Sequence, residues 1–156
     1  AITLEQKVVA IEAKVAQAKV RPRVLCLEWL DPFYVGGHWV PEMVAKAGGK
    51  DVLGRAGEPS FCVSEDQIAA SGAEIIVVMP CGFNVKRIAS EYDSTKFPDG
   101  YSSLPAVREQ RVFAVDANSY FSRPGPRLAE GVAVLAHLFH PDLFPAAPMG
   151  SSIQRL

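Results

Sequence analysis

The chain has 156 residues, of which 49% are hydrophobic and 21% are charged, and its formal net charge is −1. This length and composition are typical of one globular domain with a core of its own. The near-neutral charge and the lack of basic runs give no electrostatic case for nucleic acid as a partner. The longest apolar runs, such as residues 73–80, are too short to span a bilayer.

Residues 3–21 predict a helix that opens the chain. Thr3 and Gln6 have the spacing of a capping box, and Pro22 should end the helix because the residue before a proline is pushed out of helical geometry. Such a helix would be about 25 Å long, which is long for the first element of a small domain. Four apolar residues recur at helical spacing, namely Leu4, Val8, Ile11 and Val15.

Strands and helices alternate along the rest of the chain. Buried strands are predicted at residues 23–29, 74–79 and 111–115, with a short strand at 51–53. Helices are predicted at 38–47, 64–71 and 84–93, followed by a helical turn at 104–107 and a last helix from Pro124 or Pro126 to His140. This order predicts a Rossmann-like, three-layer α/β lobe with a mainly parallel sheet over residues 22–144. The Pro-, Ala- and Ser-rich tail at 145–156 is expected to be loosely ordered.

The loops that follow the three strong strands form the candidate binding surface, because parallel sheets bind ligands at the carboxyl ends of their strands. These loops cover residues 29–37, 80–83 and 118–127 and are rich in aromatic residues, Pro and Gly. An aromatic rim with few polar groups suits a bulky, partly apolar ligand. The alternative is that half of the aromatic residues plug the ends of the core. The candidates are Trp29, Phe33, Tyr34, Phe83, Tyr120 and Phe121.

Catalytic chemistry has weaker support. No dinucleotide-binding or P-loop motif is present. Glu28 and Asp31 are candidate paired carboxylates without a partner base or nucleophile. Cys81 would need a nearby histidine to act as a nucleophile, and only His38 lies in a comparable loop, so a thiol in the core or at the rim is the favoured interpretation.

The remaining cysteines and histidines favour structural roles. Cys26 and Cys62 are expected to be small buried hydrophobes, and a disulfide between them stays open as an alternative. His137 and His140 have a spacing that metal ligands can share, but their place at a helix end favours capping.

Four segments, in this order, resemble the C-terminal half of the cobalamin-binding proteins of ABC importers. They are RPRVLCLEWLDPFYVGGHWVPEMVAKAGG, VSEDQI, AEIIVVMPCGF and YFSRPGPRLAEGVAVLAHLFHP. These proteins are class III substrate-binding proteins, a class that also carries haem and iron–siderophores. Two α/β lobes are joined by a long helix, and the ligand lies between them. The resemblance therefore implies that residues 1–21 are the connector helix and that the N-terminal lobe is missing from this chain.

The resemblance also implies ligand contacts for individual residues. It places Tyr34 on a ligand-contacting aromatic and matches the family's aromatic-Arg loop to residues 119–123. Ser119 stands where the family's cobalamin binder has an Asp, and a ligand-stacking Trp of that binder aligns near Ser60. Together with the strand-end loops, this gives as candidate ligand-binding residues Trp29, Asp31, Tyr34, Phe83, Ser119, Tyr120 and Arg123.

Proteins of this class dock on a membrane permease through an acidic residue on each lobe. The matching position is Asp66, with Glu65 beside it. Both carboxylates would also favour a helix N-terminus, and the two roles are compatible.

The expected function is non-catalytic capture of a corrinoid or similar metal chelate for an ABC importer, in the periplasm or elsewhere outside the cytoplasm. The metal would arrive within the ligand, with no cofactor of the protein's own. No signal peptide is recognised in the chain. The alternatives are a haem- or siderophore-binding member of the same class, a stand-alone module that forms a homodimer through the exposed half-site, and an enzyme that uses Cys81.

Overall fold

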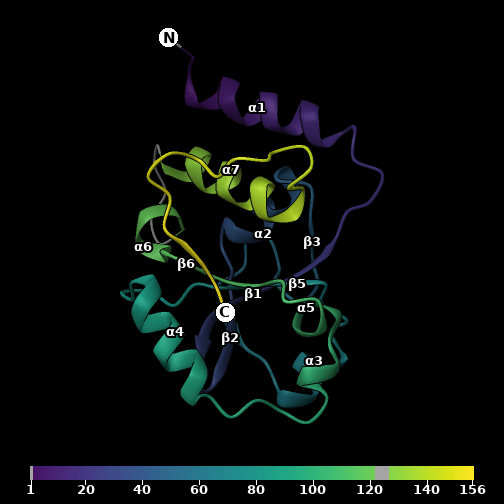
Figure 1. Cartoon of the computed structure of the whole chain (residues 1–156), viewed down its shortest axis with the longest axis vertical. Coiled ribbons are helices and arrows are strands. Elements are labelled where there is room, and N and C mark those ends of the chain that lie inside the picture. The colour runs from purple at the N-terminus through teal and green to yellow at the C-terminus, as the bar shows by residue number, and fades with distance from the viewer. Residues whose placement is uncertain (1, 122–126) are drawn as a thin grey trace.

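A mixed sheet with helices on both faces forms the body of the molecule (Figure 1). The structure is a computed structural model, and it describes residues 2–121 and 127–156. Among these residues, one seven-stranded sheet has the order β4-β2-β1-β5-β6-β7, with β3 beside β1. The strands are β1 (Arg23–Leu30), β2 (Phe33–Val35), β3 (Lys50–Asp51), β4 (Phe61–Cys62), β5 (Ile75–Val78), β6 (Val112–Val115) and β7 (Ile153–Arg155).

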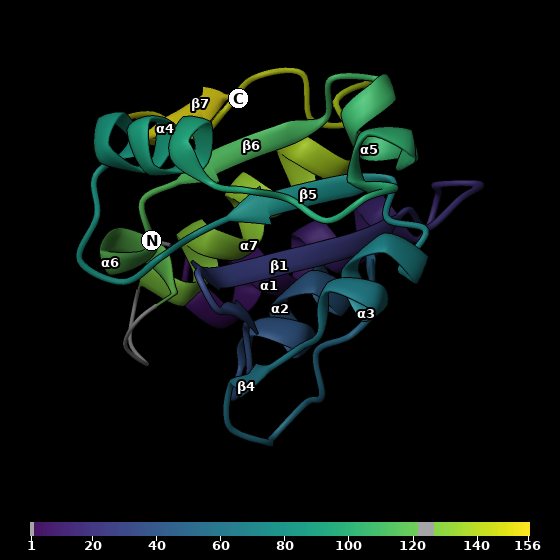
Figure 2. The same cartoon turned by 90° about the horizontal axis from the view of Figure 1, so that it is seen from below.

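Four of these strands run parallel. β1 pairs in parallel with β3 and β5, and β5 with β6, whereas β2 is antiparallel to β1 and to β4, and β7 is antiparallel to β6. Seen from below, β1, β5, β6 and β7 lie side by side (Figure 2). The predicted α/β lobe with a mainly parallel sheet is confirmed.

Both faces of the sheet are buried, because successive strand residues point to opposite faces. Ile75 and Val77 of β5 pack in one core with α2, α6 and α7, while Ile76 and Val78 pack in a second core with α3, α4 and α5. The helices are α1 (Leu4–Val15), α2 (Val40–Lys46), α3 (Glu65–Ala70), α4 (Val85–Ser94), α5 (Pro105–Arg108), α6 (Ala117–Tyr120) and α7 (Arg127–Phe139), with a 3-10 turn at Tyr101–Ser103. α1 lies outside α7, at the end of the molecule opposite α3 and α4 (Figure 1).

The opening helix is shorter than predicted. Its capping box forms as expected, but α1 has 12 residues and ends at Val15, with Ala16 as its C-cap. Tertiary packing of an apolar face is what holds most helices together. Val15 is the last residue of α1 that is buried, and Val20 is 68% exposed, so residues 16–21 have no apolar face to pack. The prediction of a continuous helix to residue 21 is wrong.

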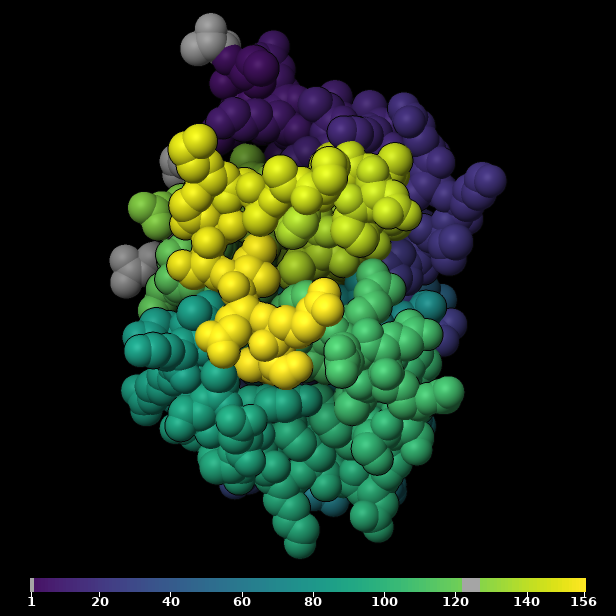
Figure 3. Space-filling model, in the orientation of Figure 1, coloured from purple at the N-terminus to yellow at the C-terminus, as the bar shows by residue number. Residues whose placement is uncertain are grey.

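The tail is more ordered than predicted. Ile153–Arg155 pair with β6 as an edge strand, Ile153 packs on one core and Leu156 on the other. The space-filling view shows this C-terminal segment, in yellow, lying on the surface over the middle of the molecule (Figure 3). The prediction of a loose tail is wrong for these residues because the open edge of β6 supplies the hydrogen-bonding partners that the tail's own composition does not reveal.

Three short elements were not predicted: β2, β4 and α6. The first two are paired with each other, and the third is a single turn capped by Asp116. β3 lies at residues 50–51 rather than 51–53. In the described part of the chain, no helix has the length and apolar character needed to cross a membrane.

Candidate functional site

An aromatic pair stands where β1 and β5 end. The rings of Trp29 and Phe83 are tilted, with centroids 5.3 Å apart, and Trp29 remains 40% exposed. The indole N–H of Trp29 donates to the carbonyl oxygen of Asp31 at 3.1 Å, which fixes the ring. The guanidinium of Arg87 lies over the other ring, 3.7 Å from the centroid of Phe83. A surface aromatic pair held in this way is a preformed platform for a flat, partly apolar ligand.

A hollow of about 260 Å³ lies beside this pair. Its wall combines the aromatic pair with Pro80 and with the side chains of Asp31 and Glu91. Glu91 also lies 3.9 Å from Arg87, one turn earlier on α4. The hollow therefore combines apolar and charged side chains, as is usual for sites that bind small molecules.

Asn118 joins the loops that follow β5 and β6. Its Oδ1 accepts a hydrogen bond from the backbone N–H of Gly82 at 3.1 Å and from the thiol of Cys81 at 3.6 Å. Asp116 holds Asn118 in turn, because it caps α6 and accepts from the N–H groups of Asn118 and Ser119 and from the Ser119 hydroxyl at 2.8 Å. Neither Asn118 nor Asp116 was predicted as a site residue, although an Asp directly after a buried strand is a recognisable capping signal.

A second cavity of about 200 Å³ opens at the same strand ends, on the side of α2 and α6. Glu28 of β1 reaches into it, and its Oε2 accepts a hydrogen bond from the hydroxyl of Ser60. The backbone N–H of Gly37 donates to the same hydroxyl oxygen at 3.2 Å. Most of the remaining wall is apolar or aromatic, formed by Trp39, Val40, Met79, Ala117 and Phe121, and Gly37, His38 and Cys81 complete it.

The predicted aromatic residues divide into two groups of three. Trp29 and Tyr34, paired across the β1–β2 hairpin, are 40% and 37% exposed, and Phe83 is half-buried. The other three are buried in the core, which agrees with the alternative that half of the aromatic residues plug its ends, although one of them, Phe121, also lines the second cavity. These are Phe33, Tyr120 and Phe121.

The polar residues that were predicted to bind the ligand lie in different environments. Asp31 is exposed beside the hollow, whereas the hydroxyl of Ser119 is held by Asp116. Burial raises the pKa of the Tyr120 hydroxyl, which fits its place in the core. Arg123 lies outside the described residues.

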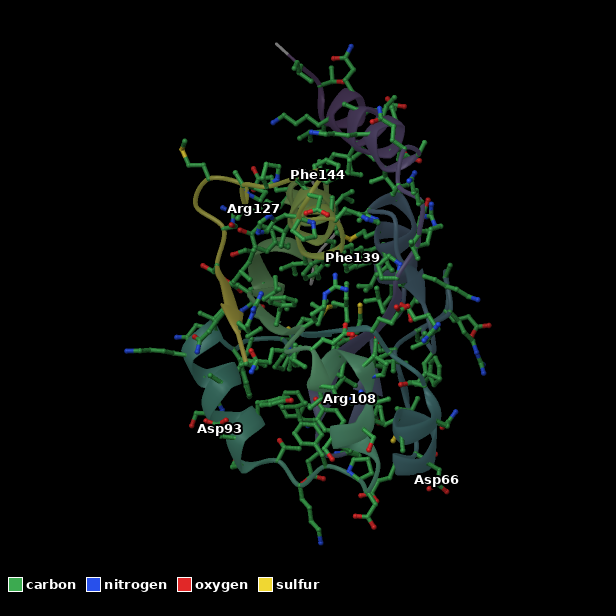
Figure 4. All side chains as sticks on the ribbon, turned by 45° about the vertical axis from the view of Figure 1, so that its right-hand side comes forward. Asp66, Asp93, Arg108, Arg127, Phe139 and Phe144 are labelled. Carbon is green, nitrogen blue, oxygen red and sulfur yellow. The ribbon has the colours of Figure 1, made fainter. Side chains whose placement is uncertain are left out.

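The two docking candidates are exposed in the first turn of α3. Ser64 caps this helix in a capping box with Gln67, as predicted. The turn that carries Glu65 and Asp66 is therefore held by hydrogen bonds between these two side chains and the backbone N–H groups. Asp66 lies at the end of the molecule opposite α1 (Figure 4). Its side chain is exposed.

The three cysteines are not joined by disulfide bridges, and Cys81 lines the second cavity together with His38. Cys26 is buried, as predicted, and burial raises the pKa of its thiol. Cys62 is exposed on the edge strand β4, so the prediction of burial is wrong, and no disulfide joins it to Cys26. The thiol of Cys81 lies beside the amide oxygen of Asn118, a group that cannot serve as a general base.

The histidines at the C-terminal end of α7 contact backbone carbonyl oxygens through their ring nitrogens. The Nε2 atom of His140 lies 3.0 Å from the carbonyl oxygen of Gly48, and the Nδ1 atom of His137 lies 2.7 Å from that of Phe144. Both contacts are structural, but neither carbonyl belongs to α7, so they do not show the predicted capping of that helix. In residues 2–121 and 127–156, no three His, Cys, Asp or Glu side chains form a group that could hold a metal ion.

Comparison with known sequences gives a short match. No protein-family model matches the chain. Over 46 residues, which are 30% of this chain and 14% of the relative, it is 48% identical to an uncharacterized ABC transporter substrate-binding lipoprotein, YvrC, of Bacillus subtilis (strain 168).

Solved structures share the fold over nearly the whole chain. The TroA-like periplasmic binding protein FepB from Veillonella parvula matches with a TM-score of 0.72 at 16% identity, over 98% of this chain and 54% of that one. The periplasmic heme-binding protein RhuT from Roseiflexus sp. RS-1 gives 0.69 at 22% identity, over 90% and 54%. An ABC-type Fe3+-hydroxamate transport system from Saccharomonospora viridis DSM 43017 gives 0.68 at 20% identity, over 92% and 47%. The chain thus spans about half the length of these structures and has the fold of about half of a TroA-like periplasmic binding protein.

Proposed function

We propose that this chain, which has the fold of one lobe of a TroA-like periplasmic binding protein, is the C-terminal lobe of a substrate-binding protein that captures a bulky metal chelate for an ABC importer. The protein would work outside the cytoplasm. Relatives named as periplasmic binding proteins and as a substrate-binding lipoprotein support both parts of the proposal.

The observation that carries the proposal is the exposed pair of Trp29 and Phe83 at the carboxyl edge of the sheet. The partly exposed indole of Trp29 offers a ring surface for stacking, and the edge is where parallel sheets bind ligands. The chelate would stack on the pair, with Tyr34 beside it, and the second lobe would cover its other side.

A corrinoid is our first candidate for the chelate, with haem and iron–siderophores as the alternatives. The solved relatives include proteins named for heme and for Fe3+-hydroxamate. In each case the metal would enter inside the ligand, as cargo. The absence of a metal-binding group among the described side chains is compatible with this arrangement.

The membrane permease would be the partner of Asp66 and Glu65. One exposed ion pair contributes only about 0–1 kcal/mol, so the corresponding acid on the other lobe would be needed for stable docking.

Self-association of two such chains through their open faces is the competing proposal, and sedimentation of the chain at several concentrations distinguishes it, since a homodimer would bury Trp29.

The experiment that tests the proposal is equilibrium dialysis of the chain with cyanocobalamin, haem and a ferric hydroxamate siderophore. Saturable binding of one of them, weakened about tenfold or more in Trp29→Ala, is expected. Leu4→Ala is the control, because Leu4 is as exposed as Trp29, at 40%, but lies on α1, which packs outside α7. Lack of binding of all three, or equal binding by Trp29→Ala, would refute the proposal.

A further inference from the structure

The cavity on the side of α2 and α6 contains a carboxylate in a mostly apolar wall. Glu28 is half-buried in β1, and the wall around it includes Trp39, Met79 and Phe121. A polar group in such a setting gives a site its orientation and selectivity, because the apolar wall itself discriminates weakly.

Glu28 is held in place by a chain of two hydrogen bonds. The N–H of Gly37 donates to Oγ of Ser60, and the hydroxyl proton of Ser60 is donated to Oε2 of Glu28. Gly37 is essential to this arrangement, since a Cβ atom there would lie 2.4 Å from the backbone nitrogen of Ser60. The segment that carries Ser60 is thereby pressed against the strand end, and the carboxylate has one defined position.

One oxygen of this carboxylate is left for a ligand. Within residues 2–121 and 127–156, Oε1 of Glu28 accepts no hydrogen bond, while Oε2 is engaged by Ser60. An ionised carboxylate is a hydrogen-bond acceptor only. A ligand group in this cavity must therefore present an N–H or O–H toward Oε1.

Carboxylate side chains line both hollows. Glu28 lines one hollow together with His38, and Asp31 and Glu91 line the other. Arg87, the cation nearest to the aromatic pair among the described residues, is paired with Glu91 and stacked on Phe83. A ligand that carries carboxylates would meet like charges on both sides of the strand ends, and like charges in a partly dry site repel strongly.

We infer that Glu28 is a specificity-determining residue that accepts a hydrogen bond from an amide N–H of the ligand and excludes chelates with a carboxylate at that position. The inference rests on the proposed function and narrows it to amide-bearing chelates. Glu28 and Trp29 are neighbours in β1 and line different hollows at the same strand ends, so the chelate would span both hollows, with its ring system on the Trp29–Phe83 pair.

Two corrinoid probes with the same ring test this inference. Dicyanocobinamide carries amides at the ring periphery, and dicyanocobyrinic acid carries carboxylates at the same positions. We expect the chain to bind the amide probe at least about tenfold more tightly, and we expect Glu28→Gln to reduce this ratio by about tenfold, largely by tightening the acid. Gln keeps an oxygen that can accept from Ser60, and unfolding in urea checks that the variant is folded.

Ser60→Ala is the second variant, because it leaves the carboxylate but removes the hydroxyl that holds it. It should lower the ratio by less than Glu28→Gln does. Trp29→Ala should weaken both probes equally and keep the ratio. An unchanged ratio in Glu28→Gln, with both probes still bound and Trp29→Ala still weakening them, would overturn the inference and leave the proposed function standing.

Two further outcomes separate the claims. Binding of gallium protoporphyrin IX, which carries two propionates, by a chain that binds neither corrinoid would overturn the inference alone. Failure of the corrinoids, of gallium protoporphyrin IX and of a ferric hydroxamate siderophore to bind the folded chain would overturn both this inference and the proposed function.

Discussion

Asn118 accepts a hydrogen bond from the backbone N–H of Gly82, which lies 36 residues earlier in the chain. This contact ties the loop after β6 to the loop after β5. The loop it holds begins the segment that presents Phe83 to Trp29. The candidate site therefore depends on a polar link between two strand ends as well as on its aromatic surface.

Replacing Asn118 with Ala should loosen this link. We expect a loss of about 1 kcal/mol in the free energy of unfolding, because one hydrogen bond to an exposed loop is removed. The amide of Gly82 should exchange faster with solvent. Asn118→Asp, which keeps an acceptor oxygen at the same place, is the control and should protect Gly82 nearly as well as the native residue. Equal exchange rates at Gly82 in all three proteins would contradict the role given to Asn118.

The rings of Trp29 and Phe83 should stabilise one another in the absence of ligand. A double-mutant cycle with Trp29→Ala and Phe83→Ala, measured by urea unfolding, should give a coupling free energy of about 0.5–1.5 kcal/mol, the usual range for an aromatic pair. The same cycle between Trp29 and Tyr92, whose ring lies in a separate cluster with Phe97 and Tyr101, is the control and should give a coupling close to zero. A coupling near zero for Trp29 and Phe83 would mean that the pair is not preformed.

Asp51 should make the protein less stable as the pH rises. Burial raises the pKa of its carboxyl above the ordinary value of 3.8, and two hydrogen bonds from the N–H groups of Leu53 and Gly54 to Oδ1 only partly oppose this effect. Within the described residues, Oδ2 is buried without a partner. The folded state therefore holds the proton more tightly than the unfolded state does. The free energy of unfolding falls as the pH rises from 3.8 through the higher folded-state pKa, and it stays lower above it.

Asp51→Asn should remove this fall. The difference in unfolding free energy between Asp51→Asn and the native protein should increase in favour of the variant from pH 3 to pH 7, because the other carboxyls contribute equally to both proteins. Urea unfolding at a series of pH values measures it. Glu65→Gln, at an exposed position, is the control and should show no such increase. A constant difference for Asp51→Asn across this range would contradict the assignment.

Asp66 should matter for transport and little for folding. Asp66→Asn is expected to change the unfolding free energy by less than about 1 kcal/mol, because it removes one favourable charge from a helix N-terminus. The same change should reduce the chelate-dependent ATP hydrolysis of the reconstituted importer. Asp93→Asn, on α4 and at a separate exposed site, is the matched control (Figure 4). Equal ATP hydrolysis with both variants would remove Asp66 as a docking residue.

The parts of the fold that were predicted are those whose signal is local. β5 is an apolar, β-branched run, and the capping boxes at Thr3 and Ser64 are four-residue patterns, so the sequence alone predicts them. β7 contains Gln154 and Arg155 and becomes a strand only because β6 offers it an edge. The end of α1 depends on where α7 stops covering it, which no periodicity within α1 encodes.

The same distinction holds for the site. Trp29, Tyr34 and Phe83 were predicted because they stand directly after buried strands. The contact between Glu28 and Ser60, which are 32 residues apart, was not predicted, because it depends on the pairing of β2 with β4. Tyr120 was misplaced because the turn of helix at Ala117–Tyr120 rotates its ring into the core.

The most direct measurement of chelate binding is an amide-resolved NMR titration of the chain with three diamagnetic chelates: cyanocobalamin, gallium protoporphyrin IX and gallium desferrioxamine. Weak binding to one lobe is detectable in this way up to millimolar concentration. At least one chelate should produce saturable shifts at the indole N–H of Trp29 and at the amides of Gly82 and Phe83, with Glu65 unaffected. No saturable shift with any of the three, or shifts confined to α1 and α3, would contradict the claim that this lobe captures a metal chelate at the carboxyl edge of its sheet.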